Sequence, residues 1–596
     1  MELKRTFDLL TRFNEQWPEK EDAMASRENG KWRKYSIGEY VKMADYMSCA
    51  LLSMGFRKGD KIATISNNRP EWNFADMGAT QAGVIHVPIY PTISDDEFTY
   101  ILRHSDSRLL IVSDKSIYNR LKPVCDSIPE IEGLYTFNMV EGAPHFSELI
   151  ELGKEKEPEF REKLKKVKDS ITPDDTLSIT YTSGTTGMPK GVMLTHRNFI
   201  ENIMGCSRCF TILPEYRVLS FLPLCHVLER MVNYYYQFAG VSIYYAENMG
   251  TIAENLRELK IDLFVTVPRL LERVYDKIIS KGKGLKGIKK QIFFWAVNLG
   301  LRFEPDNKGW WYHARLKIAR RLVFKKWQEA LGGNLKFIIT GGAALQARLA
   351  RIFWAAGIPV LEGYGLTETS PVVSVNFFER PGNVKFGTVG PVLHNVSAKI
   401  AEDGEILVKG GNVMKGYYRD EEQTAAVIDE DGWFHTGDIG LFEEGKFLKI
   451  TDRKKEMFKN SSGRYIAPQL VENKLKESLF IEQAMVVGEN EKFVSALIVP
   501  HFEFLHNWCF LHKVDYRDNT ELISIPEVID RFRKEIDEIN RSLGQTEQIK
   551  RFRLVHQEWS PDTGELSPTL KLRRKVVHEK YKDLISEIYM KGYEKG

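Results

Sequence analysis

Hydrophobic and polar positions follow one recurring pattern over the first three-quarters of this 596-residue chain. Short apolar runs, most of them stopped by Gly, Pro, Ser or Asn, alternate with longer segments of helical periodicity, such as residues 71–83 and 345–357. The runs predicted to be strands cover residues 61–68, 83–90, 107–114, 175–184, 217–224, 261–268, 335–342 and 357–365. Such alternation is typical of mainly parallel sheets covered by helices, so it predicts an α/β fold.

The pattern changes after Val389. Residues 394–410 and 440–453 alternate apolar and polar positions around the turns "EDGE" and "EEGK", which predicts hairpins. An amphipathic helix at 467–479 and a strand pair at 483–500 follow, then more helix and a basic tail. We therefore expect a large domain over residues 1–451 and a small α+β domain over 452–596. Because no low-complexity linker separates them, a compact hinge is favoured.

Composition and charge add two exclusions. The net charge is +3, with 43% hydrophobic and 28% charged residues, which is ordinary for a soluble globular protein and gives no signal for nucleic acid as a partner. The first twenty residues contain no apolar core, and no apolar run reaches the length of a membrane-spanning helix. We expect a cytoplasmic protein.

Six cysteines fit a reducing compartment better than a disulfide scaffold. Cys206 and Cys209 form a C-x-x-C pair, and Cys225 precedes His226. A zinc site usually needs a second closely spaced ligand pair that converges with the first, so buried free thiols are the favoured interpretation.

The segment "TYTSGTTGMPKGVML" at 180–194 crowds glycines, hydroxyl groups and a lysine directly after a predicted strand. The relevant residues are Thr182, Ser183, Gly184, Thr185, Thr186, Gly187 and Lys190. Glycines let backbone N–H groups face an anion, and hydroxyl groups with a lysine suit a polyphosphate. The glycine spacing differs from that of the common G-x-x-x-x-G-K-[ST] nucleotide loop. A Ser/Thr-rich surface turn is the alternative.

This loop resembles the signature loop of the adenylate-forming enzymes, which include acyl-CoA synthetases, nonribosomal adenylation domains and firefly luciferase. Five further motifs follow in the family's order, and the resemblance extends from about Phe7 to Val577. These motifs are "ITGGAAL" at 339–345, "EGYGLTET" at 362–369, "WFHTGDIG" at 433–440, and the segments 450–468 and 565–577. The resemblance implies helix-covered sheets and a distorted β-barrel-like subdomain in the large domain, with a small, mobile C-terminal domain.

The resemblance also implies roles for residues of the large domain. Those assigned to ATP or AMP, besides the loop, are Gly341, Gly342, Ala343, Glu362, Gly363, Tyr364 and Gly365. Among these, Gly341, Gly342 and Ala343 line the adenine pocket, and Tyr364 stacks on the ring. Thr367 donates to a phosphate oxygen, and Glu368 binds Mg²⁺. His226 matches a position at the floor of the acyl pocket near the phosphates; as an isolated residue, a histidine of this kind is more often part of the core.

Matching residues toward the C-terminus carry the remaining implied roles. Asp438 accepts the ribose hydroxyls, and Arg453 contacts the ribose or a phosphate. Lys455 matches the hinge, while Gly463 and Arg464 match a loop facing the thiol tunnel. Lys571 matches the catalytic lysine, although Leu570 stands where many members have glycine, and Lys575 is a weaker rival.

The implied reaction has two steps. A carboxylate attacks the α-phosphate of ATP, giving an acyl-adenylate and pyrophosphate, and Lys571 stabilises the charge that develops. The small domain then rotates about Lys455, an acceptor thiol attacks the acyl carbon, and AMP leaves.

The substrate is argued from two further segments. Residues 221–236 and 264–278 resemble long-chain fatty acyl-CoA synthetases, which implies a fatty acid as the acid and coenzyme A (CoA) as the thiol. No carrier-protein segment is present; a ligase for an external acyl-carrier protein is the alternative. A catalytically silent acyl or nucleotide sensor is disfavoured because the key residues Lys190, Glu368, Asp438, Arg453 and Lys571 are all retained.

One segment is unusually basic and aromatic. Between residues 281 and 327, Lys and Arg recur beside Phe, Trp and Tyr at helical spacing. This pattern suits peripheral contact with an anionic membrane, at the inner face of a membrane for a cytoplasmic protein. A solvated basic face over ordinary core fits equally.

Overall fold

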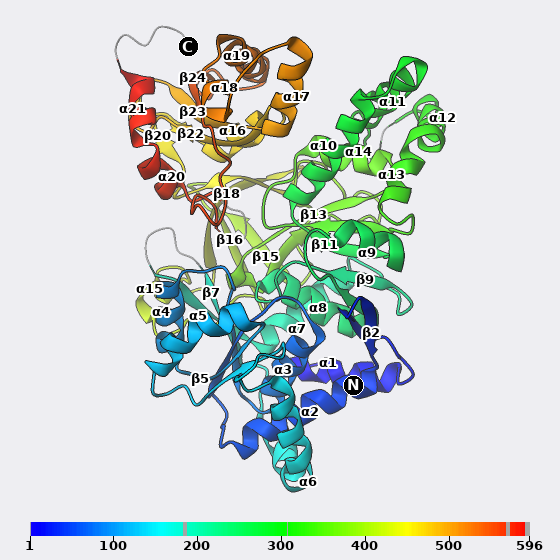
Figure 1. The fold of residues 1–596 in the computed structure, drawn as a ribbon, viewed down its shortest axis with the longest axis vertical. Coiled ribbons are helices and arrows are strands. Elements are labelled where there is room, and N and C mark those ends of the chain that lie inside the picture. The colour runs from blue at the N-terminus through cyan, green and yellow to red at the C-terminus, as the bar shows by residue number, and fades with distance from the viewer. Residues whose placement is uncertain (1, 183–187, 307, 568–571, 591–596) are drawn as a thin grey trace. The chain divides into compact units, whose positions relative to one another are not determined.

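The computed structural model describes residues 2–182, 188–306, 308–567 and 572–590 (Figure 1). The chain divides into two compact units. The large unit comprises the chain up to Ala398 together with Leu407–His435 and Glu444–Leu448; the small unit comprises Lys399–Ile406, Thr436–Glu443 and the chain from Lys449. The single domain boundary expected near Thr451 stays a prediction, as does movement about it.

An eight-stranded sheet of the large unit has the order β14-β13-β12-β11-β9-β10-β1-β2. Its strands are β1 (Met24–Glu28), β2 (Lys31–Tyr35), β9 (Arg217–Ser220), β10 (Ser242–Tyr245), β11 (Leu263–Thr266), β12 (Phe337–Thr340), β13 (Val360–Gly365) and β14 (Val372–Val375). The strands from β13 to β1 are parallel, and β14 and β2 pair antiparallel at the edges. Interior strands such as β10 and β11 are buried at every position, as expected for a parallel sheet covered on both faces.

A seven-stranded sheet, also in the large unit, has the order β17-β8-β7-β4-β3-β5-β6. Its strands are β3 (Lys61–Ile65), β4 (Ile85–Pro88), β5 (Ser107–Val112), β6 (Gly133–Thr136), β7 (Thr176–Thr182), β8 (Lys190–Thr195) and β17 (Gly416–Tyr417). The strands from β6 to β7 are parallel, whereas β8 folds back antiparallel on β7 and β17 pairs with β8. All eight predicted strands are therefore confirmed, and both sheets are mainly parallel, as predicted.

Helices cover these sheets. They are α1 (Thr6–Gln16), α2 (Ile37–Ser53), α3 (Pro70–Gln81), α4 (Asp95–Ser105), α5 (Lys115–Asp126), α6 (Phe146–Ser170), α7 (His196–Ser207), α8 (Val227–Ala239), α9 (Ile252–Leu259), α10 (Pro268–Lys283), α11 (Gly287–Gly300), α12 (Trp310–Ala319), the π-helical turn η1 (Arg320–Phe324), α13 (Lys325–Ala330), α14 (Ala347–Ala355) and α15 (Glu421–Ala425). The predicted helices at 71–83 and 345–357 are confirmed as α3 and α14. No helix of the described ranges is both long and apolar enough to cross a membrane.

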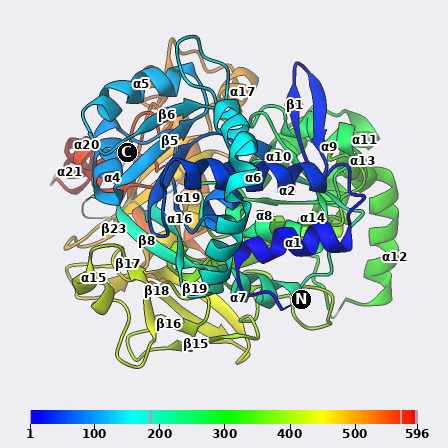
Figure 2. The ribbon, with the colours of Figure 1, turned by 90° about the horizontal axis from the view of Figure 1, so that it is seen from below.

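The helix α2 is packed closely by two partners. A Cβ atom at Gly153 of α6 would lie 1.8 Å from the carbonyl oxygen of Tyr46, and one at Gly78 of α3 would lie 2.5 Å from the Cβ of Met47. These glycines therefore let both helices approach α2 more closely than any larger residue would allow. Figure 2 shows α2 and α6 side by side.

A buried polar network joins helices to the seven-stranded sheet. Arg230 of α8 forms an ion pair with Asp76 of α3, and the two side chains are 1% and 0% exposed. Arg230 also donates to the Ser178 hydroxyl of β7, at 2.5 Å, and Tyr234 donates to Asp76 at the same distance. The His86 Nδ1 lies 2.7 Å from Asp76. Burial lowers the pKa of His86, so its ring stays neutral, and its Nδ1–H donates to the Asp76 carboxylate.

The remaining strands follow the change of pattern after Val389. A four-stranded sheet, β15-β16-β18-β19, consists of β15 (Val396–Ile400), β16 (Glu405–Gly410), β18 (Phe434–Glu443) and β19 (Phe447–Arg453). It corresponds to the predicted hairpins and the β-rich subdomain. A short two-stranded sheet, β20 (Phe458–Lys459) with β21 (Tyr465–Ile466), follows.

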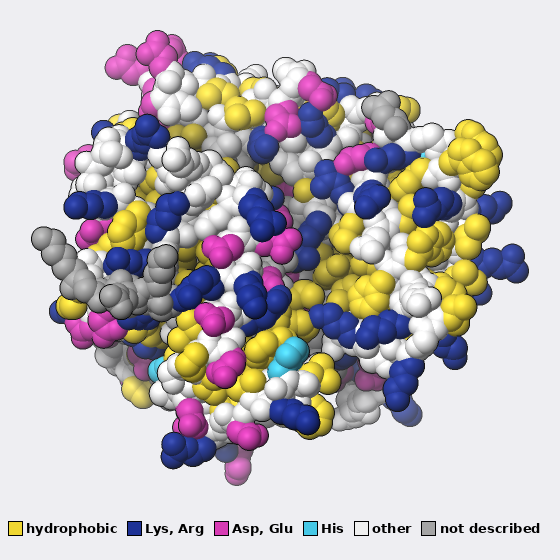
Figure 3. Space-filling model, turned by 90° about the horizontal axis from the view of Figure 1, so that it is seen from above, with side chains coloured by type: hydrophobic (Ala, Val, Ile, Leu, Met, Phe, Trp, Pro, Cys, Tyr) yellow, Lys and Arg dark blue, Asp and Glu magenta, His cyan; other side chains and the backbone are white. Residues whose placement is uncertain are grey.

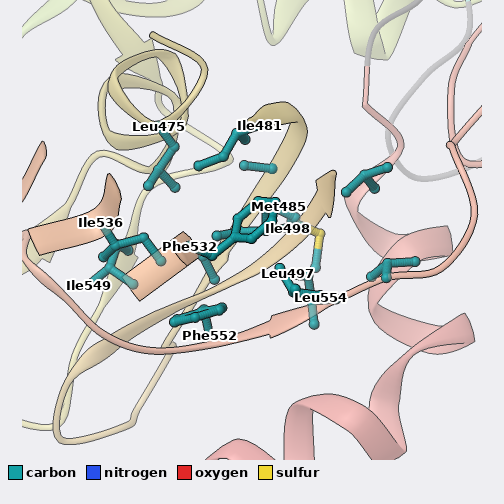
Figure 4. Close-up of a cluster of buried hydrophobic side chains, with 14 of the residues drawn as sticks. Leu475, Ile481, Met485, Leu497, Ile498, Phe532, Ile536, Ile549, Phe552 and Leu554 are labelled. Atoms are coloured by element: carbon teal, nitrogen blue, oxygen red, sulfur yellow. The ribbon is translucent and has the colours of Figure 1, made fainter. Parts of the chain in front are cut away.

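The core of the small unit lies on a three-stranded sheet made of β22 (Ile481–Val487), β23 (Val494–Pro500) and β24 (Ile549–Leu554). Its helices are α16 (Pro468–Leu475), α17 (Phe502–His512), α18 (Asn519–Leu522), α19 (Pro526–Asn540), α20 (Arg574–Lys580) and α21 (Lys582–Tyr589). Figure 4 shows Leu475 of α16 and Phe532 of α19 with apolar side chains of all three strands in one cluster. The predicted helix at 467–479 and antiparallel pair at 483–500 are confirmed.

Candidate functional site

The predicted site residues that the structure describes fall into two sets, one in each unit. The large unit contains Thr182, Lys190, His226, Gly341, Gly342, Ala343, Glu362, Gly363, Tyr364, Gly365, Thr367 and Glu368; the small unit contains Asp438, Arg453, Lys455, Gly463 and Arg464. Ser183, Gly184, Thr185, Thr186, Gly187 and Lys571 lie outside the described residues.

The hydroxyl-rich loop comprises residues 183–189, and a β-hairpin fixes the residues on either side of it. Thr182 at the end of β7 and Lys190 at the start of β8 are direct partners across this hairpin. The Lys190 ammonium donates to the Gln423 side-chain oxygen at 2.6 Å and lies 4.9 Å from the centre of the Tyr417 ring. An aromatic face attracts a cation without neutralising it. Lys190 is thus held in place while its charge remains available to an anion.

Tyr417 connects this lysine to Glu368. Glu368 lies in a short 3₁₀ turn, η2 (Thr367–Thr369), directly after β13. The Tyr417 hydroxyl donates to the Glu368 carboxylate at 3.0 Å. Burial raises the pKa of Tyr417, so the phenol keeps its proton and remains a donor. The structure thereby brings together two predicted site residues, Lys190 and Glu368, through a tyrosine that the sequence reasoning missed.

Glu368 offers a single carboxylate. Such a site suits Mg²⁺ better than it suits a metal ion that is held by protein side chains alone. Within the described ranges there is no group of three His, Cys, Asp or Glu side chains that would hold a metal ion. Mg²⁺ commonly binds through one or two carboxylates together with substrate phosphates and water.

The six cysteines are all buried and free, which agrees with the favoured interpretation of Cys206, Cys209 and Cys225.

The glycine-rich segment after β12 lies beside β13. Because β12 and β13 are parallel neighbours, their carboxyl ends meet at one edge of the sheet, where α/β proteins commonly bind ligands. Gly342 has a φ of +79°, a conformation that favours glycine, and Gly342 and Ala343 are exposed. This segment therefore offers exposed backbone with little side-chain bulk. At Gly365, in contrast, backbone packing alone explains the glycine, because a Cβ would lie 1.8 Å from the Pro371 carbonyl oxygen.

Glu362, in the protein interior, holds the end of this glycine-rich segment in place. Its buried carboxyl group accepts a hydrogen bond from the backbone N–H of Leu345 at 2.8 Å, which ties the end of the glycine-rich segment to β13. Burial raises the pKa of Glu362 to about 8, so the group is mostly protonated at neutral pH. A direct contact between Glu362 and ATP stays a prediction. Gly363 and Tyr364 are only partly buried.

His226 caps the N-terminus of α8. Its Nδ1 accepts from the backbone N–H of Leu228 at 3.2 Å, which leaves the ring proton of the neutral form on Nε2. The turn before it is held by Asn68, which donates to the Leu222 carbonyl at 2.6 Å and accepts from the Leu224 N–H at 3.0 Å. A half-buried imidazole N–H donor therefore sits at a helix N-terminus, a position that favours negative charge.

In the small unit, Asp438 and Arg453 lie together. The Arg453 Nε is 3.2 Å from the Asp438 carboxylate, which is only 6% exposed, and the backbone N–H of Asp438 donates to the Thr436 hydroxyl. An arginine thus fixes the carboxylate that is predicted to accept ribose hydroxyls.

The predicted hinge and tunnel residues are exposed. Lys455 lies in the turn after β19, whose other lysine, Lys454, is tied to Asp403 and Glu405 at 2.6 and 2.8 Å. Gly463, with a φ of +77°, and Arg464 lie in the turn between β20 and β21. Exposure leaves the side chains of Lys455 and Arg464 accessible.

Two family models match the chain. One, described as AMP-binding enzyme, matches residues 10–418, and the other, described as AMP-binding enzyme C-terminal domain, matches residues 456–592.

Curated relatives cover nearly the same extent. The long-chain-fatty-acid–CoA ligase FadD15 of Mycobacterium tuberculosis is 33% identical over 573 residues, covering 94% of this chain and 93% of the relative. The peroxisomal long chain acyl-CoA synthetase 7 of Arabidopsis thaliana is 31% identical, with coverages of 94% and 82%.

Among solved structures, the A domain of a carboxylic acid reductase from Segniliparus rugosus, in complex with AMP and a carboxylic acid, has a TM-score of 0.74 at 19% identity, covering 98% of this chain and 94% of that one. The anthranilate CoA ligase AuaEII has a TM-score of 0.72 at 17% identity, with coverages of 98% and 99%. At these identities the likeness shows the fold.

Proposed function

Because the chain belongs to the adenylate-forming AMP-binding enzymes and is an acid–thiol ligase, we propose that it is an AMP-forming long-chain fatty acid–CoA ligase. The observation that carries the proposal is the link from Lys190 through Tyr417 to Glu368, which joins an ammonium beside the hydroxyl-rich loop to a carboxylate suited to Mg²⁺. The names of the relatives support the fatty acid and CoA as substrates.

The first step uses the residues predicted to bind ATP. Lys190 and the hydroxyl-rich loop bind the ATP phosphates, and Asp438, fixed by Arg453, accepts the ribose hydroxyls. Glu368 would hold Mg²⁺, which when bound neutralises phosphate charge. A fatty-acid carboxylate oxygen attacks the α-phosphorus, and the bond to pyrophosphate breaks. The Lys571 ammonium stabilises the negative charge that grows on the α-phosphate oxygens, and the Nε2–H of His226 is an additional donor for the substrate carboxylate.

The second step exchanges adenylate for thioester. The CoA thiolate attacks the acyl carbon, and the bond between that carbon and the AMP oxygen breaks, releasing AMP. We assign Lys455 to the hinge about which the small domain turns between the steps, and Gly463 and Arg464 to the wall of the thiol tunnel.

One assay tests this function. Incubation with ATP, Mg²⁺, CoA and fatty acids of increasing chain length is expected to give AMP and long-chain acyl-CoA, and EDTA is expected to abolish both products. AMP or trapped acyl-adenylate without acyl-CoA would instead indicate a carrier protein as the acceptor. Neither product, despite ATP binding, would indicate a sensor and contradict the proposal.

We also propose that the large unit contacts an anionic membrane through helices α10 to α13. The segment 281–327 contains thirteen Lys and Arg and two acidic residues, a net charge of +11, which leaves −8 for the rest of the chain. Five apolar side chains of these helices, Ile288, Trp310, Trp311, Ile318 and Leu322, are 52% to 71% exposed. Figure 3 shows hydrophobic side chains with Lys and Arg around them on its right, where α11 and α12 lie in Figure 1.

The helix formed by α12, η1 and α13 has two apolar faces. Leu316, Val323 and Trp327 are buried, whereas Ile318 and Leu322 point to solvent. A surface helix normally has one apolar face, and a second one beside a dense positive charge is typical of helices that lie in a lipid interface. Nucleic acid would use the charge but not the exposed aliphatic side chains, so anionic lipid fits this surface better.

Vesicle binding tests this contact. The protein is expected to sediment with vesicles that contain anionic phospholipid and not with neutral ones. The double variant Lys325→Gln/Lys326→Gln should lose about 2 kcal/mol of binding, or ~30-fold, since each basic residue contributes roughly 1 kcal/mol. Trp311→Ser should also weaken binding, whereas Phe510→Ser, another highly exposed aromatic residue outside this segment, should not. Equal binding to both vesicle types, or binding to single-stranded DNA alone, would contradict the proposal.

A further inference from the structure

Arg574, the first residue of α20, is tied to two carboxylates of the small unit. Its Nε donates to Glu456 at 2.9 Å, and a terminal nitrogen donates to Glu472 at 2.6 Å. The three side chains are only 19%, 16% and 8% exposed. Charge-assisted hydrogen bonds of this kind are among the strongest in proteins, and the guanidinium geometry fixes their direction.

The two carboxylates are themselves held in place by different elements. Glu472 lies in α16, and its other oxygen accepts from the Val486 N–H of β22 at 2.7 Å. Glu456 directly follows the proposed hinge residue Lys455, and it also accepts from Gln469 of α16 at 2.9 Å. Arg574 therefore connects the start of α20 both to the sheet of the small unit and to the turn that contains the hinge.

The chain on either side of residues 568–571 is also fixed. Leu566 and Leu572 form an antiparallel bridge, and the Arg573 N–H donates to the Glu565 carbonyl at 2.8 Å. The Glu565 carboxylate pairs with Lys580 of α20 at 2.5 Å. Lys571 directly precedes Leu572 in the chain, and the bridge to Leu566 restrains the backbone at Leu572. Arg574, which anchors the start of α20, follows Lys571 by three residues.

We propose that Arg574, held by Glu456 and Glu472, is a positioning residue for acyl-adenylate formation. It fixes Leu572 and the start of α20, the residues that directly follow Lys571 in the chain. This inference rests on the function proposed above. Because only the first step uses Lys571, loss of the anchor should affect that step and spare the second.

Two half-reactions measured separately test the role of Arg574. The first is fatty-acid-dependent exchange of pyrophosphate into ATP, and the second is thioester formation from supplied acyl-adenylate and CoA. Arg574→Gln is expected to slow exchange by about 10- to 100-fold, the usual cost of misplacing a catalytic group by about 1 Å, with thioester formation unchanged. Arg574→Lys keeps the charge but loses the planar fork, so its exchange rate should lie between those of the unaltered protein and Arg574→Gln.

Two controls separate positioning from folding. Arg573→Gln, at the exposed neighbouring arginine, should change neither half-reaction. The double variant Lys571→Ala/Arg574→Gln should exchange no more slowly than Lys571→Ala alone, because the anchor acts through that lysine. Equal loss of both half-reactions, or an additional loss in the double variant, would overturn the positioning role. Absence of exchange with any acid in the unaltered protein would instead overturn the proposed function, and this inference with it.

Discussion

Replacing Lys571 by alanine is expected to slow acyl-adenylate formation by about 10²- to 10³-fold, the usual cost of removing one group that stabilises transition-state charge. ATP binding should change little, because Lys190, Glu368 and Asp438 are the residues proposed to make the ground-state contacts. Thioester formation from supplied acyl-adenylate should be retained, because no bond to phosphorus forms or breaks in that step. Pyrophosphate exchange and nucleotide binding, measured on the same preparation, check these results.

Lys575 provides the matched control for this prediction. It lies four residues further along the same basic segment and was the rival for the catalytic role. Lys575→Ala should retain exchange close to that of the unaltered protein. Normal exchange in Lys571→Ala together with lost exchange in Lys575→Ala would transfer the catalytic role to Lys575.

The largest stability effect is expected for Arg230→Ala, which should lower the free energy of unfolding by about 3–5 kcal/mol. The substitution leaves Asp76 charged and buried without its ion-pair partner, and it removes the donor to Ser178. Desolvation by burial opposes ionisation of Asp76, and Arg230 is the main cause that lowers its pKa in spite of this burial. Urea unfolding followed by fluorescence measures the change.

A surface ion pair of the same unit is the control. Arg197 and Asp174 lie 2.6 Å apart, but their side chains are 46% and 66% exposed. Arg197→Ala should therefore cost less than about 1 kcal/mol, because water already screens this pair. Similar losses for the two variants would show that burial of the Arg230 pair does not set its contribution to stability.

Much of the fold was predictable because its signals are local. Runs such as residues 261–268 and 335–342 are short, apolar and stopped by Pro or Gly, and helical patterns lie between many of these runs. Those features determine strand type and the parallel arrangement without knowledge of long-range contacts. The hairpin pattern after Val389 is equally local, because a turn of a few residues specifies it.

Parts of the site were not predictable because they depend on pairing between distant segments. Tyr417 reaches Glu368 and Lys190 only because β17 pairs with β8, more than two hundred residues earlier in the chain. In the sequence, Tyr417 is one of two adjacent tyrosines with nothing to distinguish it. Arg574 is likewise one of several cations in a basic tail, and the carboxylates that define its role lie more than one hundred residues away. The roles of Lys571 and of the loop from Ser183 to Gly187 stay predictions.

The uneven charge along the chain has a consequence for how the protein would move near a surface. With a net charge of +3, the whole molecule feels little pull toward an anionic surface from a distance. At physiological ionic strength, electrostatic attraction extends only about 8 Å, roughly the width of one helix. The net charges of +11 on residues 281–327 and −8 on the rest of the chain therefore act mainly once the protein is close to the surface, where they exert a torque that orients it. Such a protein arrives by diffusion and is turned on contact, so added salt should disturb its orientation more than its rate of encounter.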